Sequence, residues 1–105
     1  MPAPEITPAE LAPRLGSVTL IDVRQPAEYG SGCIATARLM PLADVPDHLD
    51  ELKGLEIVVV CRSGSRSAVA AEFLMENGIS AHNLAGGIVA WFEAGHEVVT
   101  GDQPA

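Results

Sequence analysis

Aromatic residues, basic residues and long apolar runs are all scarce in this sequence. Aromatics make up 4% of the 105 residues, so the core must be built mainly from Val, Ile, Leu and Ala. Six Lys and Arg stand against 14 Asp and Glu, which gives a net charge of −8. Nucleic acids and anionic membranes are bound by positive surfaces, so we expect neither as a partner. The longest apolar run, residues 84–92 with its two glycines counted, is too short to cross a bilayer.

Cysteine is scarce as well, and its spacing excludes two kinds of protein. Cys33 and Cys61 form no Cys-x-x-Cys pair and make neither a disulfide framework nor a zinc site. No metal, dinucleotide or phosphate-loop motif is present, so we expect no cofactor and no metal. Residues 1–10 lack the basic and apolar regions of a signal peptide. We therefore expect a cytoplasmic protein with one domain over residues 1–105, a core over about 7–99 and a frayed tail at 101–105.

Short β-branched runs alternate with amphipathic segments, which is typical of an α/β fold with a mainly parallel sheet. The first helix is marked by a capping box at Thr7 and Glu10, and the third by an N-cap at Asp44. We predict strands at residues 18–23, 37–40, 57–60, 82–84 and 97–99, the last of which closes the sheet. We predict helical segments at residues 7–15, 25–30, 44–54, 67–77 and 88–93. The core residues expected from the last two helices include Val69, Ala70, Phe73, Leu74, Trp91 and Phe92.

The strongest chemical signal is a cysteine between a buried strand and a helix. The apolar run 57–60 leads directly into Cys61, and a loop of small residues follows. Ligands bind at the carboxyl ends of parallel strands, and a Gly/Ser loop can point successive backbone N–H groups inward as an anion-binding nest. The N–H donors at the start of the next helix add to this effect. Cys61 in such a loop is expected to be a thiolate near neutral pH.

The loop also concentrates positive charge in an acidic chain. Arg62 and Arg66 are two of the six basic residues, and guanidinium groups hold oxyanions through paired hydrogen bonds. The sequence does not fix whether either side chain points inward or outward. A buried structural cysteine beside two solvated arginines is the simpler alternative, and the combination of Cys, Arg, Gly and Arg argues against it. The residues expected to bind an anionic substrate are Arg62, Ser63, Gly64, Ser65 and Arg66.

At these residues the chain resembles the single-domain rhodanese (thiosulfate sulfurtransferase-like) family. The resemblance rests on residues 20–24 with Glu28 and Tyr29, on the loop 61–67, and on residues 84–87 followed by Trp91. It implies a rhodanese-like α/β fold, with a mainly parallel sheet of about five strands flanked by helices on both faces. It also implies that Cys61 is the catalytic cysteine. The implied reaction moves a sulfane sulfur from thiosulfate or a persulfide donor to a thiol, cyanide or protein acceptor through a Cys61 persulfide.

Four questions remain open at the level of sequence. The four residues between Cys61 and Arg66 favour sulfur transfer over phosphatase or arsenate reductase chemistry, because those relatives have one more residue there. A persulfide carrier that serves a protein partner is the alternative to an enzyme. Asp22 and Arg24 end a strand on the side of Cys61, so they either support the loop, directly or through a pair with Glu28, or form a purely structural ion pair. Cys33 stands where many members have histidine, as a second thiol able to resolve a persulfide or, more simply, as a small buried side chain.

Overall fold

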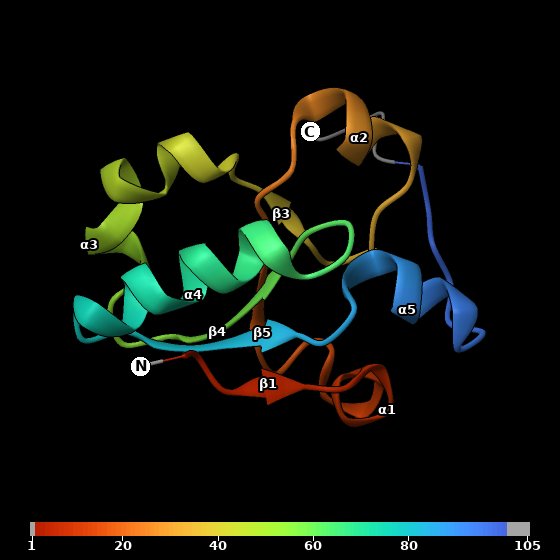
Figure 1. The fold of residues 1–105 in the computed structure, drawn as a ribbon, viewed down its shortest axis with the longest axis horizontal. Coiled ribbons are helices and arrows are strands. Elements are labelled where there is room, and N and C mark those ends of the chain that lie inside the picture. The colour runs from red at the N-terminus through yellow and green to blue at the C-terminus, as the bar shows by residue number, and fades with distance from the viewer. Residues whose placement is uncertain (1, 101–105) are drawn as a thin grey trace.

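The computed structural model describes residues 2–100, and these residues build one five-stranded sheet in the order β1-β5-β4-β2-β3 (Figure 1). Every neighbouring pair of strands is parallel, which confirms the predicted α/β class. The strands are β1 (Glu5–Ile6), β2 (Thr19–Asp22), β3 (Arg38–Leu39), β4 (Glu56–Val60) and β5 (Ser80–Leu84). The helices are α1 (Pro8–Leu11), α2 (Pro26–Ser31), α3 (Leu49–Leu52), α4 (Ser65–Glu76) and α5 (Gly87–Glu93), with 3₁₀ helices η1 (Ala12–Arg14) and η2 (Leu42–His48).

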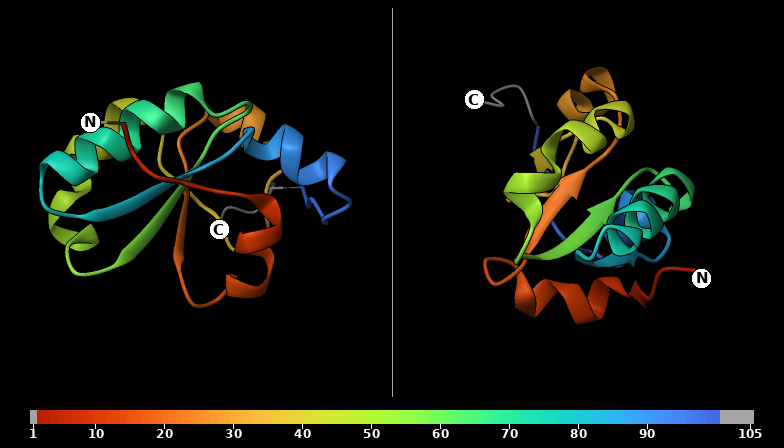
Figure 2. Two further views of the ribbon diagram at one scale, coloured as in Figure 1. Left: turned by 60° about the horizontal axis from the view of Figure 1, so that its bottom comes forward. Right: turned by 90° about the vertical axis from the view of Figure 1, so that its left-hand side faces the viewer.

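Helices cover both faces of the sheet, as predicted (Figure 2). Successive strand residues point to opposite faces, so β4 divides its side chains between two cores. Ile57 and Val59 pack in a cluster with residues of η2, α3 and α4. Val58 and Val60 pack in a second cluster with residues of α1, α2 and α5. A strand buried on both faces needs an apolar residue at every position, which is why the run at 57–60 was readable from the sequence.

The predicted closing strand at residues 97–99 is wrong. Val99 makes only an isolated antiparallel bridge, in which it exchanges two backbone hydrogen bonds with Cys33 at 2.7 and 2.8 Å. The edge position belongs instead to β1, which pairs with β5 through the carbonyl groups of Pro4 and Ile6. A strand of two residues is too short to show an alternating pattern, so β1 could not be predicted from periodicity.

The third predicted helix is also corrected. Residues 42–48 form the 3₁₀ helix η2, and only Leu49–Leu52 are α-helical. Asp44 lies in the first turn of η2 and is not its N-cap. Pro46 lies inside η2, where its missing N–H and its ring oppose a regular α-helix. The capping box of the first helix is confirmed, because the Glu10 N–H donates to Thr7 Oγ1 at 3.1 Å and the Thr7 N–H donates to Glu10 Oε1 at 2.9 Å.

Two residues predicted in the core are exposed. Val69 of α4 is 58% exposed and Phe92 of α5 is 66% exposed. In α4 the buried stripe is Ser67, Ala70, Ala71 and Leu74. This stripe has regular helical spacing. Because its first residue is the polar Ser67, the predicted apolar face was displaced by one position and included Val69 in place of Ala71. Adjacent helical residues point about 100° apart, so Trp91 is buried while Phe92 faces outward.

Within residues 2–100, no helix combines the length and apolar character that a membrane crossing requires. The tail predicted to be frayed, residues 101–105, lies outside the described residues.

Candidate active site

The loop between β4 and α4 holds Cys61 at the carboxyl end of a central strand. In Figure 1 this loop lies beside α2 and α5. Gly64 has a φ of +109°, a conformation that side chains rarely allow, and it turns the chain into α4. Helix α4 therefore begins at Ser65, two residues earlier than predicted. The Cys61 residue is only 1% exposed, so its sulfur lies at the bottom of the loop.

Hydrogen-bond donors converge on the Cys61 sulfur. The Gly64 N–H lies 3.1 Å from Sγ, and the Ser67 Oγ lies 3.2 Å from it. Burial by itself raises the pKa of the Cys61 thiol, but hydrogen bonds from the Ser67 hydroxyl and from the N–H groups of Ser67, Gly64 and Ser63 outweigh it. The pKa of Cys61 is therefore below its ordinary value. The loop provides what a cysteine nucleophile needs, namely a stabilised thiolate.

Asn83 connects this loop to β5 and was not predicted from the sequence. It is 3% exposed, its Nδ2 donates to the Gly64 carbonyl at 3.0 Å, and its Oδ1 lies 2.5 Å from Ser67 Oγ. Ser67 has one proton, so its hydroxyl donates either to Asn83 or to the Cys61 sulfur. A polar residue in the buried end of a strand was the signal available in the sequence for Asn83.

The two loop arginines have different surroundings. Arg66 donates two hydrogen bonds to the Glu28 carboxylate of α2, at 2.8 and 2.9 Å. This bidentate pair, with a backbone hydrogen bond from Gln25, lowers the pKa of Glu28 to about 2. Arg62 has no ion-pair partner among residues 2–100. Of the two predicted anion-binding side chains, Arg62 is thus the one whose charge is not already neutralised.

Asp22 and Arg24 form a buried ion pair with each other. Arg24 Nη2 donates to Asp22 Oδ2 at 2.7 Å and to the Gly32 carbonyl at 2.7 Å. Arg24 Nε donates to Asp22 Oδ1 at 2.9 Å. Glu28 pairs with Arg66 instead. These hydrogen bonds hold the end of α2 near β2, and none of them goes to residues 61–67.

Cys33 is a small buried side chain on the other side of the sheet from Cys61. It is 2% exposed and belongs to the cluster around α1, α2 and α5, whereas Cys61 belongs to the cluster around α3 and α4. Burial raises the pKa of the Cys33 thiol. Its placement gives no support to a role in resolving a persulfide.

The start of α5 packs directly on the backbone of the loop. The Ile88 N–H donates to the Cys61 carbonyl at 2.9 Å, and the Val89 N–H donates to the Arg62 carbonyl at 3.1 Å. Gly87 has a φ of +63°, and a Cβ at this position would overlap both of these carbonyl oxygens. Gly87 thus permits the close approach of α5 to the loop backbone.

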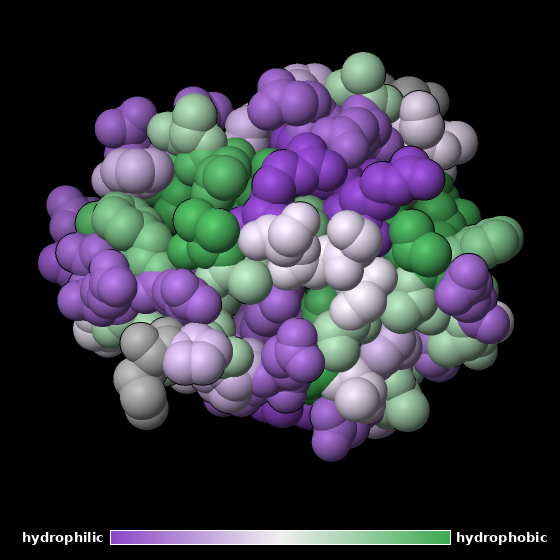
Figure 3. All heavy atoms as spheres, viewed as in Figure 1, coloured by the Kyte–Doolittle hydropathy of each residue, from purple (hydrophilic) through white to green (hydrophobic). Residues whose placement is uncertain are grey.

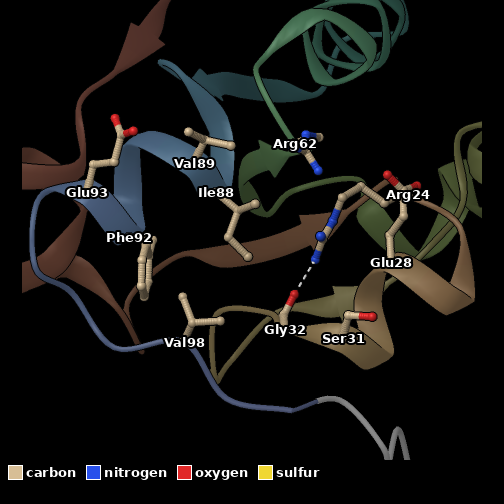
Figure 4. Close-up of a pocket in the computed structure, with 10 residues that line it drawn as sticks. All are labelled: Arg24, Glu28, Ser31, Gly32, Arg62, Ile88, Val89, Phe92, Glu93 and Val98. Carbon is tan, nitrogen blue, oxygen red and sulfur yellow. Dashed lines mark hydrogen bonds between the residues drawn. The ribbon is translucent and has the colours of Figure 1, made fainter.

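Beside the loop lies a groove of about 470 Å³, called here the α5 groove (Figure 4). In Figure 3 the apolar surface of α5 borders a hydrophilic area over α2 and the loop. Apolar side chains of α5 and of the segment after it form the middle of the groove, and charged side chains lie toward its ends. Its lining residues are Arg24, Glu28, Ser31, Gly32, Arg62, Ile88, Val89, Phe92, Glu93 and Val98. Among residues 2–100 no group of three or more His, Cys, Asp or Glu could hold a metal ion.

Comparison with known proteins identifies the family. The Rhodanese-like domain matches residues 7–94, so the chain belongs to the rhodanese-like family. It is 39% identical over 100 residues to a sulfurtransferase of Allochromatium vinosum, with 90% of this chain and 94% of the relative covered. A rhodanese-related protein of Thermoplasma volcanium has a similar structure, with a TM-score of 0.86, 34% identity and coverage of 91% and 97% of the two chains. A rhodanese-like domain protein of Staphylococcus aureus gives a TM-score of 0.81 at 37% identity, with 92% and 99% covered. Family and relatives together support a sulfurtransferase activity in general terms.

Proposed function

We propose that this protein is a sulfurtransferase in which Cys61 carries the sulfur as a persulfide. The observation that carries the proposal is the convergence of the Gly64 N–H and the Ser67 hydroxyl on the Cys61 sulfur, at 3.1 and 3.2 Å. These groups stabilise a negative charge on the sulfur before reaction. In the persulfide, the N–H donors of the same loop stabilise the negative charge on the outer sulfur.

The first half-reaction loads the sulfur. The Cys61 thiolate attacks the outer sulfur of thiosulfate, a new S–S bond forms, the S–S bond of the donor breaks, and sulfite leaves with the electron pair. With a persulfide donor, a thiolate leaves in place of sulfite. Arg62 attracts the anionic donor, and the backbone of Ser63, Gly64 and Ser65 forms the binding loop. Arg66 contributes by fixing the loop to Glu28 of α2.

The second half-reaction unloads the sulfur. A thiolate or cyanide attacks the outer sulfur of the persulfide, and the electron pair of the broken bond returns to Cys61. The first product leaves before the acceptor reacts, so ping-pong kinetics follow. Because the nucleophile must stay reduced, and because both Cys33 and Cys61 are free thiols, a reducing compartment such as the cytoplasm is the proposed location.

The test is the intact mass of the protein before and after incubation with thiosulfate. Wild type and Cys33→Ala are expected to gain one sulfur atom, which cyanide removes as thiocyanate, while Cys61→Ala gains none and has no turnover. Sulfur retained on Cys61→Ala, or thiocyanate formation by that variant at the wild-type rate, would overturn the proposal. A persulfide that forms on wild type but is released to cyanide only slowly would indicate a carrier that serves a protein acceptor.

A further inference from the structure

The Arg66–Glu28 ion pair neutralises a positive charge at the loop that holds Cys61. Arg66 directly precedes Ser67, whose hydroxyl oxygen lies 3.2 Å from the Cys61 sulfur. The pKa of Arg66 is raised, first by its hydrogen bonds to Glu28 and to a smaller extent by the negative charges of Glu28 and Cys61. The guanidinium group therefore lies within electrostatic reach of the sulfur, and a carboxylate matches its charge before any substrate arrives.

Glu28 is held in this position from two sides. Its Oε1 and Oε2 accept from Arg66 Nη1 and Nη2 at 2.8 and 2.9 Å, and Oε1 also accepts from the Gln25 N–H at 3.0 Å. The bond to Gln25 belongs to the capping box that begins α2. The end of α2 is fixed in turn by the hydrogen bond from Arg24 to the Gly32 carbonyl at 2.7 Å. A carboxylate fixed in this way, with a pKa of about 2, stays charged and beside Arg66 throughout the physiological pH range.

Little positive charge is left for a substrate of the loop. Of Arg24, Arg62 and Arg66, only Arg62 has no carboxylate partner among residues 2–100. The groups in contact with the Cys61 sulfur, a backbone N–H and a hydroxyl, are neutral donors. Sulfate and thiosulfate carry two negative charges, and phosphate esters carry nearly as much at neutral pH. A divalent oxyanion beside the Cys61 thiolate would therefore place three negative charges against the single free charge of Arg62.

We propose that Glu28 determines the specificity of the loop by occupying Arg66, so that divalent oxyanions bind weakly and sulfur donors that bring at most one charge are preferred. This inference rests on the proposed function and identifies the class of donor, a persulfide in preference to thiosulfate. A persulfide presents one small sulfur to Cys61, whereas the oxygens of thiosulfate must compete with the Glu28 carboxylate for the guanidinium group. Glu28 acts through Arg66, because none of its own hydrogen bonds goes to the sulfur.

The kinetic experiment compares thiosulfate with glutathione persulfide as donors for wild type and Glu28→Gln. The substitution removes the charge but keeps an oxygen that can accept from the Gln25 N–H. We expect kcat/KM for thiosulfate to rise about tenfold or more, because a charge-assisted hydrogen bond from Arg66 becomes available to the donor. We expect kcat/KM for glutathione persulfide to change much less, so that the ratio of the two donors moves toward thiosulfate.

The matched control is Glu76→Gln at the other end of α4. It makes the same change in net charge, and Glu76 has no ion-pair partner among residues 2–100. At 1.5 Å per residue it lies roughly 16 Å along the helix from Ser65, the first residue of α4. Glu76→Gln is expected to leave the ratio of the two donors unchanged.

A binding experiment gives a readout that does not depend on sulfur transfer. Sulfate is a divalent oxyanion that cannot load Cys61, and its binding at the loop slows alkylation of Cys61 by iodoacetamide. At constant ionic strength, sulfate is expected to protect Glu28→Gln at concentrations that leave wild type unprotected. Each protein is compared with its own rate without sulfate, because the freed Arg66 also lowers the pKa of Cys61. Protection is expected to disappear in Glu28→Gln/Arg66→Gln, since the gain requires the guanidinium group.

Three results would overturn the inference. Wild type and Glu28→Gln with the same sulfate protection and the same kcat/KM for thiosulfate would show that Glu28 does not restrain Arg66. A gain that persists in Glu28→Gln/Arg66→Gln would have another cause. Strong protection of wild-type Cys61 by sulfate would refute the inference without any variant, as would a loss of activity with both donors in a folded Glu28→Gln, because the pair would then only support the loop.

Failure of this inference is distinguishable from failure of the proposed function. If wild type gains sulfur from thiosulfate and Glu28→Gln responds to sulfate as wild type does, the role of Glu28 is wrong and the role of Cys61 stands. If wild type gains no sulfur from thiosulfate or from glutathione persulfide, the proposed function itself is wrong. The sulfate experiment still decides the role of Glu28 in that case, because alkylation requires only a reactive thiolate.

Discussion

At the scale of single residues, the direction in which the Ser67 hydroxyl donates its hydrogen bond depends on the charge of Cys61. Its oxygen lies 3.2 Å from the Cys61 sulfur and 2.5 Å from Asn83 Oδ1. When Cys61 is a thiol, its proton can point to the Ser67 oxygen while Ser67 donates to Asn83. When Cys61 is a thiolate, the Ser67 proton turns to the sulfur, because only a donor stabilises the negative charge. Asn83 remains bonded to the Gly64 carbonyl in both states and keeps the loop in place.

We predict that Ser67→Ala raises the pKa of Cys61. A hydrogen bond to a charged group contributes about 1.5–3 kcal/mol, so alkylation by iodoacetamide at neutral pH is expected to slow by about tenfold or more. The pH dependence of the alkylation rate measures the change, and its midpoint moves to higher pH. The control is Ser63→Ala, which keeps the backbone N–H that Ser63 contributes to the sulfur. An unchanged pH profile in Ser67→Ala would show that the backbone alone stabilises the thiolate.

The candidate nucleophile was predictable from sequence, but its supporting side chains were not. Cys61 and its loop are contiguous, so a strand, a cysteine and a Gly/Ser turn are visible in one short window. Asn83 and Glu28 act across 16 and 38 positions of sequence, respectively. Nothing in their own neighbourhoods indicates which residue they contact, because that depends on the strand order and on the placement of α2.

At the scale of elements, the contact between α5 and the loop depends on Gly87. A side chain at this position meets the carbonyl oxygens of Cys61 and Arg62, and the backbone has a positive φ. We predict that Gly87→Ala lowers the free energy of unfolding by about 2–4 kcal/mol, from overpacking and backbone strain together. Urea unfolding measures the change. The matched control is Gly30→Ala in α2, where a Cβ meets nothing within 4 Å and no loss of stability is expected.

Equal stability of Gly87→Ala and wild type would mean that α5 can shift away from the loop without cost. In that case the hydrogen bonds from Ile88 and Val89 to the loop carbonyls would not be essential to the fold.

The elements that were predicted correctly are those with their own periodic signal. β2, β4 and α4 combine apolar patterns with clear turns, and their positions were found to within about two residues. We predicted that the segment 97–99 closes the sheet, whereas β1 occupies the edge in the structure. Both are short and partly polar, and what decides between them is pairing with β5 or with Cys33, which is a property of the tertiary structure.

At the scale of the whole molecule, the charge of the protein opposes the charge of its proposed donor. The net charge is −8, and the described residues measure only 32 × 27 × 23 Å across. Around the loop, Arg24 and Arg66 are neutralised by carboxylates, so Arg62 is the main local attraction. At an ionic strength of about 0.01 M the screening length is roughly 30 Å. Thiosulfate at the loop is therefore repelled by most of the negative charge of the protein.

We therefore predict that kcat/KM for thiosulfate rises as salt increases from about 0.01 to 0.1 M, because screening at about 10 Å removes the distant repulsion and leaves Arg62 effective. The rate of Cys61 alkylation by iodoacetamide, an uncharged reagent, is expected to change little over the same range. Steady-state kinetics at several chloride concentrations make the comparison. A rate with thiosulfate that falls with salt would mean that attraction to Arg62 dominates even at long range.

The carbonyl groups of the loop are bonded from outside, and this has a consequence for the strength of the donors inside. The Cys61 and Arg62 carbonyls accept from α5, and the Gly64 carbonyl accepts from Asn83 of β5. A peptide group whose oxygen accepts a hydrogen bond is polarised and becomes a better donor at its N–H. Part of the loop's affinity for anionic sulfur therefore originates in α5 and β5, outside residues 61–67. Transplanting the seven-residue motif alone into the strand–helix turn of another protein would therefore transfer the cysteine with only part of its reactivity.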